Sequence, residues 1–237
     1  TIAGDLVLLS GGTITDDGIA TVRGTLTATT DAGDSAITLN QLAVTGAFTL
    51  APDGTGAVTI VNAAGLILAA STMGGTFSGT ATTGNITQTG ALDIEGVTTL
   101  VTIGQGATID LAANGTGNAF TSQLLITTND SNTPNDGTYA ANVSVDGGTT
   151  NLIIGLSTID GNLTLLSGGT ITDDGIATVR GTLTATTDAG DSAITLNQLA
   201  VTGALTLDPD DTGAVTIVNA VNLDLAASTM GGTFSGT

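Results

Sequence analysis

Residues 1–10 read Thr-Ile-Ala-Gly-Asp-Leu-Val-Leu-Leu-Ser, and residues 158–167 read Thr-Ile-Asp-Gly-Asn-Leu-Thr-Leu-Leu-Ser. The similarity extends over residues 1–80, which return as residues 158–237, shifted by 157 positions and with nine substitutions. Repeats of this fidelity are typical of chains whose stacked units contact only their neighbours and add length without a new fold. The sequence therefore predicts that the chain is a segment of a tandem array. Such an array is unusual for an enzyme, because an enzyme rarely needs several copies of its active site.

The substitutions between the two copies follow a period of two. Apolar residues such as Leu6 and Leu8 are kept as Leu163 and Leu165, while the positions between them become polar. These polar-tolerant positions are Ala3, Asp5, Val7, Gly65 and Ile67, which become Asp160, Asn162, Thr164, Asn222 and Asp224. Because successive side chains of a β-strand point to opposite faces, the pattern indicates strands with one dry and one wet face.

The composition favours many short strands around a narrow interior. The chain has 49 Thr and 35 Gly, with 41% apolar but only 2% aromatic residues. Thr and Val favour half-buried pleated surfaces and Gly supplies tight corners. We expect an aliphatic core a few side chains wide. Phe48 and Ala64 become Leu205 and Val221, so both positions are predicted to lie inside.

A shorter period lies within the long one. Candidate strand-opening residues are spaced by 20, 22, 18, 20, 23, 34 and 20 positions, so seven units of about 22 residues fill one 157-residue superrepeat. These residues are Leu6, Leu26, Phe48, Leu66, Ile86, Ile109, Val143 and Leu163. The spacing predicts an all-β parallel solenoid, a right-handed β-helix, rising roughly 33 Å per seven turns.

The predicted organisation is therefore continuous. Residues 1–157 form a first superrepeat of seven turns, and residues 158–237 begin a second that continues the first. A row of Ig-like sandwich domains is the alternative fold, which an unbroken ladder through residues 150–165 would exclude. The polar segment 129–137 in the 34-residue unit predicts a loop that projects from the rod, either as a solvated excursion or as a binding element.

The charge excludes several classes of partner. Twenty Asp and one Glu oppose only Arg23 and Arg180, giving a net charge of −19. Such a surface repels nucleic acid and anionic lipid and attracts cations. No apolar stretch reaches 18 residues, so no membrane-spanning helix is predicted. Since the chain begins without Met or a basic leader, we expect an interior piece whose export signal lies elsewhere.

The chemistry available to the chain is narrow. Without His, Cys or Lys, the usual nucleophile and base pairs are missing, so we expect no enzyme and assign no catalytic or cofactor-binding residue. Acidic turns at residues 15–18, 172–175 and 208–211 offer hard oxygen ligands, but none matches a complete calcium loop. The turn 208–211 is moreover Ala51-Pro52-Asp53-Gly54 in the other copy. We interpret these acids as turn formers and solvating charge and assign no metal ligand, with calcium sites as the alternative.

A regular row of threonines would suggest ice binding, but the row does not continue. Thr25, Thr27 and Thr29 alternate along one predicted strand, whereas the positions after Phe48 are Thr49 and Ala51. Thr is therefore interpreted as a strand former on the wet face.

Three short strings resemble a known family. Gly-Asn-Leu-Thr-Leu at 161–165, Gly-Thr-Leu-Thr-Ala-Thr at 181–186 and Gly-Ala-Leu-Thr-Leu at 203–207 are similar to the repeat regions of filamentous-haemagglutinin-type adhesins. The resemblance covers nearly the whole chain as texture and implies a secreted, right-handed parallel β-helix in an adhesive or biofilm fibre. The amino-terminal secretion domain of that family is not in the sequence, which leaves the export route open.

These observations together predict the shaft of a large bacterial surface adhesin or extracellular filament. The expected partners are neighbouring repeats, with end-to-end or lateral self-association and a host or matrix surface, and with neither nucleic acid nor membrane insertion. The alternatives are a cation-bridged homotypic matrix or sheath and an ice- or glycan-binding solenoid.

Overall fold

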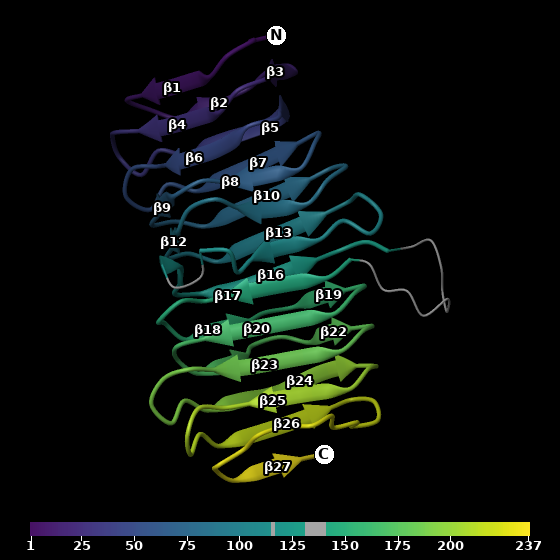
Figure 1. The fold of residues 1–237 in the computed structure, drawn as a ribbon. Helices are drawn as coiled ribbons and strands as arrows, with labels where there is room; N and C mark the ends of the chain where they lie inside the picture. The colour runs from purple at the N-terminus through teal and green to yellow at the C-terminus, as the bar shows by residue number, and fades with distance from the viewer. Residues whose placement is uncertain (115–116, 131–140) are drawn as a thin grey trace.

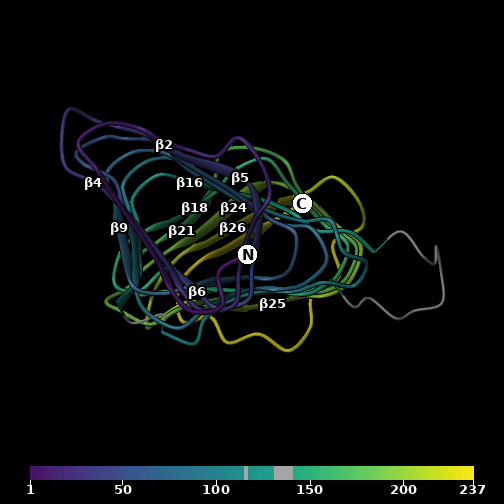
Figure 2. The same cartoon turned by 90° about the horizontal axis from the view of Figure 1, so that it is seen from above.

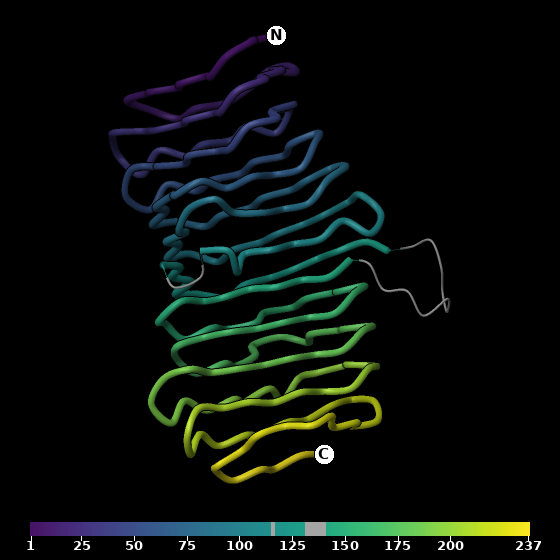
Figure 3. The backbone as a smooth tube through the Cα atoms, viewed as in Figure 1, coloured from purple at the N-terminus to yellow at the C-terminus, as the bar shows by residue number. Residues whose placement is uncertain are grey.

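The computed structural model describes residues 1–114, 117–130 and 141–237 as a coil of parallel strands. Twenty-seven strands and no helix occur among these residues. The chain winds steadily from the N-terminus at one end to the C-terminus at the other, with each coil lying directly on the coil before it (Figures 1 and 3). The all-β parallel solenoid predicted from the sequence is therefore confirmed, with about ten turns.

Every turn contributes one strand to the first sheet, which has ten strands. Most of their inward residues are apolar, with buried polar exceptions such as Thr30, Gln88 and Ser167, and they alternate with more exposed residues that are mainly polar. The strands, in sheet order, are β1 (Leu6–Ser10), β4 (Leu26–Thr30), β6 (Ala47–Ala51), β8 (Leu66–Leu68), β11 (Ile86–Gln88), β14 (Ile109–Leu111), β17 (Val143–Asp146), β20 (Leu163–Ser167), β23 (Leu183–Thr187) and β25 (Leu205–Asp208).

The second sheet lies on the opposite side of the coil and has fourteen strands, because some turns split their strand in two. The strands are β2 (Ile14–Thr15), β3 (Ala20–Val22), β5 (Ile37–Val44), β7 (Val58–Asn62), β10 (Phe77–Ala81), β13 (Thr98–Thr102), β16 (Gln123–Thr127), β18 (Leu152–Ile154), β19 (Ser157–Ile159), β21 (Ile171–Asp173), β22 (Ala177–Val179), β24 (Ile194–Val201), β26 (Val215–Asn219) and β27 (Phe234–Gly236).

A short third sheet closes the coil in the middle turns. It consists of β9 (Ser71–Met73), β12 (Leu92–Ile94) and β15 (Ala119–Phe120). Seen down the axis, the coils superpose around a flattened interior (Figure 2). The cross-section therefore has two long faces, and a third, narrow face in the turns that carry the third sheet.

The predicted strand-opening residues all lie in the first sheet. Seven of the eight begin their strands, and Phe48 is the second residue of β6. Their Cα atoms pair in register, for example Leu6 with Leu26 and Val143 with Leu163. All strand pairs among the described residues are parallel, and only an isolated bridge between Ala119 and Gly148 is antiparallel. The alternative of Ig-like sandwich domains, which are antiparallel, is therefore wrong.

The period of two separates interior from surface, with one correction. In β20, Leu163 and Leu165 are buried while Thr164 between them is exposed. Phe48 and Leu205 are both fully buried, as expected. Val221, in contrast, is 47% exposed, so its predicted interior position is wrong. It follows the strand β26 in a corner, where the alternation of the strands no longer applies.

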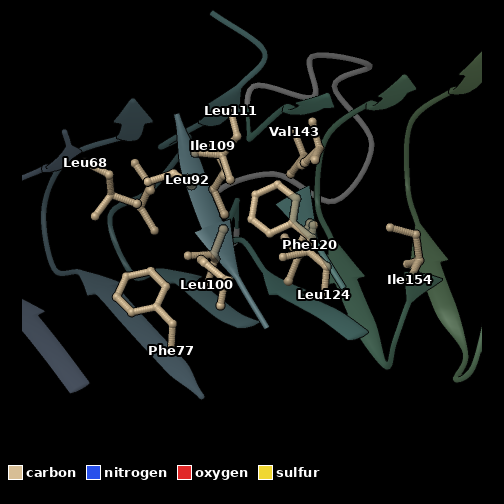
Figure 4. Close-up of a cluster of buried hydrophobic side chains, with 14 of the residues drawn as sticks. Leu68, Phe77, Leu92, Leu100, Ile109, Leu111, Phe120, Leu124, Val143 and Ile154 are labelled. Carbon is tan, nitrogen blue, oxygen red and sulfur yellow. The ribbon is translucent and has the colours of Figure 1, made fainter. Parts of the chain in front are cut away.

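The core is one continuous aliphatic cluster that runs the length of the coil. Leu, Ile and Val dominate it, and in the middle turns Phe77 and Phe120 fill the interior beside Leu100 and Leu124 (Figure 4). Three of the four Phe are fully buried, so the few aromatic residues serve as core fillers. Dense packing of this kind disfavours changes in side-chain volume.

Close corners explain part of the glycine content. The Gly181 backbone N–H donates to the Gly161 carbonyl oxygen at 3.0 Å, one coil back. A Cβ atom on Gly181 would lie 2.7 Å from that same oxygen. Because real Cβ contacts are not that short, only glycine allows the two coils to stack at this corner.

Candidate functional site

The acidic turns at residues 15–18 and 172–175 bind the backbone of the next coil. Both carboxylate oxygens of Asp173 accept hydrogen bonds, from the backbone N–H of Asn197 at 3.0 Å and of Gln198 at 2.7 Å. Asp16 makes the same two contacts at the same distances with Asn40 and Gln41. The interpretation of these aspartates as turn formers misses this role, because the partner atoms lie about 24 residues away in sequence.

The recipient N–H groups belong to a β-bulge. In β24 the register with β26 shifts between Leu196 and Leu199, so that two residues there oppose one in the next strand. A bulge leaves backbone donors without ladder partners. The Asp173 carboxylate supplies an acceptor for both, and so fixes the bulge in place.

The third acidic turn, residues 208–211, is built differently. The Asp210 backbone N–H donates to the Thr187 hydroxyl at 2.9 Å, and Asp211 has a left-handed backbone with φ of 42°. Gly54 occupies the equivalent place in the first copy with φ of 49°. Among the described residues, no three acidic side chains gather closely enough to hold a metal ion.

A second set of side-chain acceptors joins the coils at one corner. The Thr25 backbone N–H donates to Asp5 Oδ1 at 2.7 Å, and the equivalent Thr182 N–H donates to Asn162 Oδ1 at 2.8 Å. The hydrogen bond from this N–H, reinforced by one from the Thr25 hydroxyl, lowers the pKa of Asp5. Asp and Asn are interchangeable here because each offers an oxygen in the same position.

The base of the predicted loop is held by charged and polar groups. Asp130 donates its backbone N–H to Asp160 Oδ2 at 3.0 Å, and Arg180 Nη1 lies 3.4 Å from Asp160 Oδ1. Arg180 Nη1 also donates to the Asp130 carbonyl oxygen at 3.4 Å. Ala3 occupies the equivalent position in the first copy, so that copy has no carboxylate there. Residues 131–137 of the predicted loop lie outside the described residues.

The bulge also creates a ridge on the outer face of the second sheet. Between the paired positions Thr172 and Ala177 the chain has four residues, 173–176, whereas the next coil has three and the one after it two. Residues 16–19 repeat this feature in the first copy. We call residues 16–19 and 173–176 the bulge ridge.

A shallow groove lies beside the ridge in each copy, with a volume of about 300 Å³. We call it the bulge groove. In the second copy it is lined by Ile176, Asn197, Gln198, Leu199, Val218 and Ala220. The corresponding residues Ile19, Asn40, Gln41, Leu42, Val61 and Ala63, with Thr82, line it in the first copy. The same surface therefore recurs once in each superrepeat, although sequence reasoning did not identify it.

Comparison with known proteins adds a family to this repeated architecture. Residues 1–51, 55–127 and 140–208 match the model of a family described as repeats of unknown function, DUF5649. The chain belongs to this family. None of the curated proteins and none of the solved structures compared with it gives a match. The DUF5649 match, together with the stacked parallel strands, shows a β-helix repeat protein.

The DUF5649 solenoid also carries a more polar hollow of about 320 Å³. It lies across β14, β17 and β20 on the outer face of the first sheet. Its lining is Thr108, Ile109, Asp110, Asn142, Val143, Ser144, Asn162 and Thr164. Hydroxyl, amide and carboxylate groups at this density suit a hydroxyl-rich ligand better than an apolar one, so this is where a glycan would be sought.

Threonines, with one serine, also form a row that was not predicted from the sequence. It runs along the second sheet, where Cα partners follow one another through five turns: Thr15, Thr38, Thr59, Ser78 and Thr99. The row predicted to break in the first sheet does break, because Ala51 pairs with Thr29. Beside the new row stand Val61, Thr80 and Val101, so the DUF5649 surface has no flat threonine plane at this place.

The described residues of the DUF5649 chain include no helix of the length and apolar character needed to cross a bilayer. The features that do recur are the aspartate-fixed bulge, its ridge and its groove. The surface thus offers repeated contacts rather than a single concave pocket.

Proposed function

We propose that the chain is part of the rod-like shaft of a large bacterial surface adhesin or extracellular filament. The observation that carries this proposal is the parallel ladder of the first sheet, which continues through ten turns from β1 to β25. In such a ladder each coil is hydrogen-bonded to the next on two faces at once. Tension along the axis is then shared among many backbone hydrogen bonds.

The repeat makes length the adjustable property of such a shaft. Equivalent strands β1 and β20 are seven turns apart in the first sheet. At about 4.7–4.9 Å per turn, one superrepeat adds roughly 33 Å to the rod. Since neighbouring units contact only each other, superrepeats can be added or removed without a new core.

The surface supports an extracellular setting. A net charge of −19 keeps parallel fibres apart and soluble. The similarity of residues 161–165, 181–186 and 203–207 to filamentous-haemagglutinin-type repeats supports secretion and an adhesive role. The partners proposed are neighbouring repeats of the array and a host or matrix surface.

Changing the repeat number tests the shaft. Deleting one 157-residue superrepeat from the gene in the producing cell should shorten the surface fibre by roughly 33 Å in negative-stain electron micrographs. An antibody to the solenoid should label intact cells before and after the deletion. Fibres of unchanged length, or labelling only after lysis, would contradict the proposal.

The glycan-binding alternative has its own test at the polar hollow. Asp110→Ala and Ser144→Leu alter its lining without touching the core, since both side chains point outward from β14 and β17. On a glycan array, any glycan that binds the parent chain at this hollow should no longer bind either variant. Binding that both variants retain would place the glycan elsewhere.

A further inference from the structure

In the bulge ridge, the number of residues across the strand break reaches its maximum in a single coil. The number of residues between the positions paired with Thr172 and Ala177 differs from coil to coil. It is three in the coil of β18 and β19, four in the coil of β21 and β22, and three in the coil of β24. The coil of β26 has two. Residues 173–176 therefore form the crest of a ridge that rises and falls along the rod.

The ridge is held rigidly. The two hydrogen bonds from Asn197 and Gln198 to Asp173 tie the crest to the coil below it. A preformed surface loses little conformational freedom on binding, which favours contact at this place over contact at a loosely held loop.

The crest presents apolar side chains to solvent. Ile176 is 53% exposed although coils lie on both sides of it, and Val218 across the groove is 41% exposed. Leu156, one coil before the crest, is 65% exposed. A projecting isoleucine beside an apolar-floored groove is self-complementary in shape, since the projection of one molecule can enter the groove of another.

The charges next to the ridge are self-complementary as well. The only two cations of the chain, Arg23 and Arg180, each follow an aspartate of the ridge, Asp17 or Asp174, by six residues. Arg23 makes no ion pair with any described residue, whereas Arg180 pairs with Asp160, whose side chain is 19% exposed, and donates to the Asp130 carbonyl oxygen. If two such segments cross in antiparallel directions, the aspartate of one faces the arginine of the other. Elsewhere the approach of two chains of charge −19 is repulsive.

We propose that the bulge ridge and bulge groove form a lateral contact with a second copy of this chain. Two rods lie antiparallel, Ile176 of each enters a bulge groove of the other, and Asp17 or Asp174 of one rod pairs with an arginine of the other. On each rod the two ridges lie seven turns apart. In an antiparallel pair the Ile19 ridge of one rod therefore meets the Ile176 ridge of the other, and both contacts form together. Two weak contacts on rigid rods then reinforce each other.

Sedimentation velocity over a concentration series at physiological salt tests the apolar part. The parent chain should show a monomer and dimer in exchange. Ile19→Asn combined with Ile176→Asn should weaken the dimer at least about tenfold, because the apolar surface that both isoleucines would bury in the contact is lost. Ile103→Asn is the matched control, since Ile103 is 51% exposed but lines neither groove. A parent chain that remains monomeric, or a double variant that dimerises like the control, overturns the proposal.

Charge reversal tests the antiparallel pairing. Arg23→Asp with Arg180→Asp should abolish dimerisation, and so should Asp17→Arg with Asp174→Arg. Mixing these two variants should restore it as a heterodimer, and combining all four changes in one chain should restore the homodimer. If neither the mixture nor the combined variant recovers association, this pairing is wrong.

The proposal assumes the rod described under the proposed function, and the two can fail separately. Circular dichroism and small-angle X-ray scattering report the strand content and the length of the monomer. A monomeric rod of the expected length overturns the lateral contact and leaves the shaft intact. A compact or unfolded particle overturns both.

Discussion

The Asn62 side chain forms hydrogen bonds with both the N–H and the carbonyl oxygen of Val44 in the preceding coil. Its Oδ1 accepts the Val44 N–H at 2.8 Å, and its Nδ2 donates to the Val44 carbonyl oxygen, also at 2.8 Å. Nδ2 further donates to the Gly65 carbonyl oxygen at 2.6 Å. Asn62 is fully buried, and Asn219 makes the equivalent contacts in the second copy.

This arrangement predicts that replacing Asn62 with an apolar residue of similar size destabilises the fold. Asn62→Leu should lower the free energy of unfolding by roughly 2–4 kcal/mol, because the polar backbone of Val44 is left buried without these partners. Chemical denaturation measures the loss. Asn40→Leu, on the exposed outer face of β5, is the control and should change stability little. Similar effects from the two variants would contradict the role given to Asn62.

The Asp173 carboxylate should protect two specific amides. Asp173→Ala removes the acceptors of the Asn197 and Gln198 N–H groups, so hydrogen exchange at these two amides should become much faster. Asp174→Ala removes the same charge from the neighbouring position and should leave both amides protected. Unchanged protection in Asp173→Ala would show that the bulge is fixed by other contacts.

Thr98 offers a stabilising substitution. Its Oγ1 is buried and has no hydrogen-bond partner among the described residues. It lies between Phe77 and Leu124 in the inward column of the second sheet. Thr98→Val replaces the hydroxyl with a methyl group of similar volume and should raise the free energy of unfolding by about 1 kcal/mol.

The nearby surface provides the comparison for Thr98. Thr99→Val makes the same chemical change on the outward face of β13 and should lie within about 0.5 kcal/mol of the parent. A thermal melt of the two variants separates the effects. A lower melting temperature for Thr98→Val would indicate that its hydroxyl has a partner after all.

Asp191 should contribute a pH-dependent part of the stability. Hydrogen bonds from the Thr212 hydroxyl, and then from its backbone N–H, lower the pKa of Asp191 in the folded chain. A carboxyl group with a lowered folded pKa stabilises the fold above its unfolded pKa of about 3.9, and this contribution is lost as the pH falls through the folded pKa.

Asp191→Asn isolates that contribution. Asn tolerates the left-handed backbone of Asp191, which has φ of 58°, so the change removes the charge without new strain. The variant should melt below the parent at pH 7, and the difference should narrow below about pH 4. Asp188→Asn removes a charge from the same turn and serves as the control. A difference that stays constant with pH would exclude the carboxylate as its source.

The sequence by itself determined the architecture, because the spacing of its repeated apolar residues equals the length of one turn of the coil. The polar change at Thr164 marks the outward side of β20 in the first sheet, and those at Asp160 and Asn162 lie in the corner just before it. The eight strand-opening residues could be found because inward leucines and isoleucines recur at nearly constant spacing. Local alternation and repeat length are properties of the chain itself, and they fix strand direction and the size of a turn.

What the sequence could not give is which residue touches which in the neighbouring coil. The sequence predicts a turn former at Asp173, yet its role depends on two N–H groups 24 and 25 residues later. The bulge ridge exists only because successive coils carry four, three and two residues across one gap, a difference visible only after the strands are in register. The predicted burial of Val221 is wrong for a different reason, because a corner interrupts the alternation on which that prediction depended. Tertiary structure decided these points because the stacking of coils, unlike the pleat of a strand, is set by contacts between residues distant in sequence.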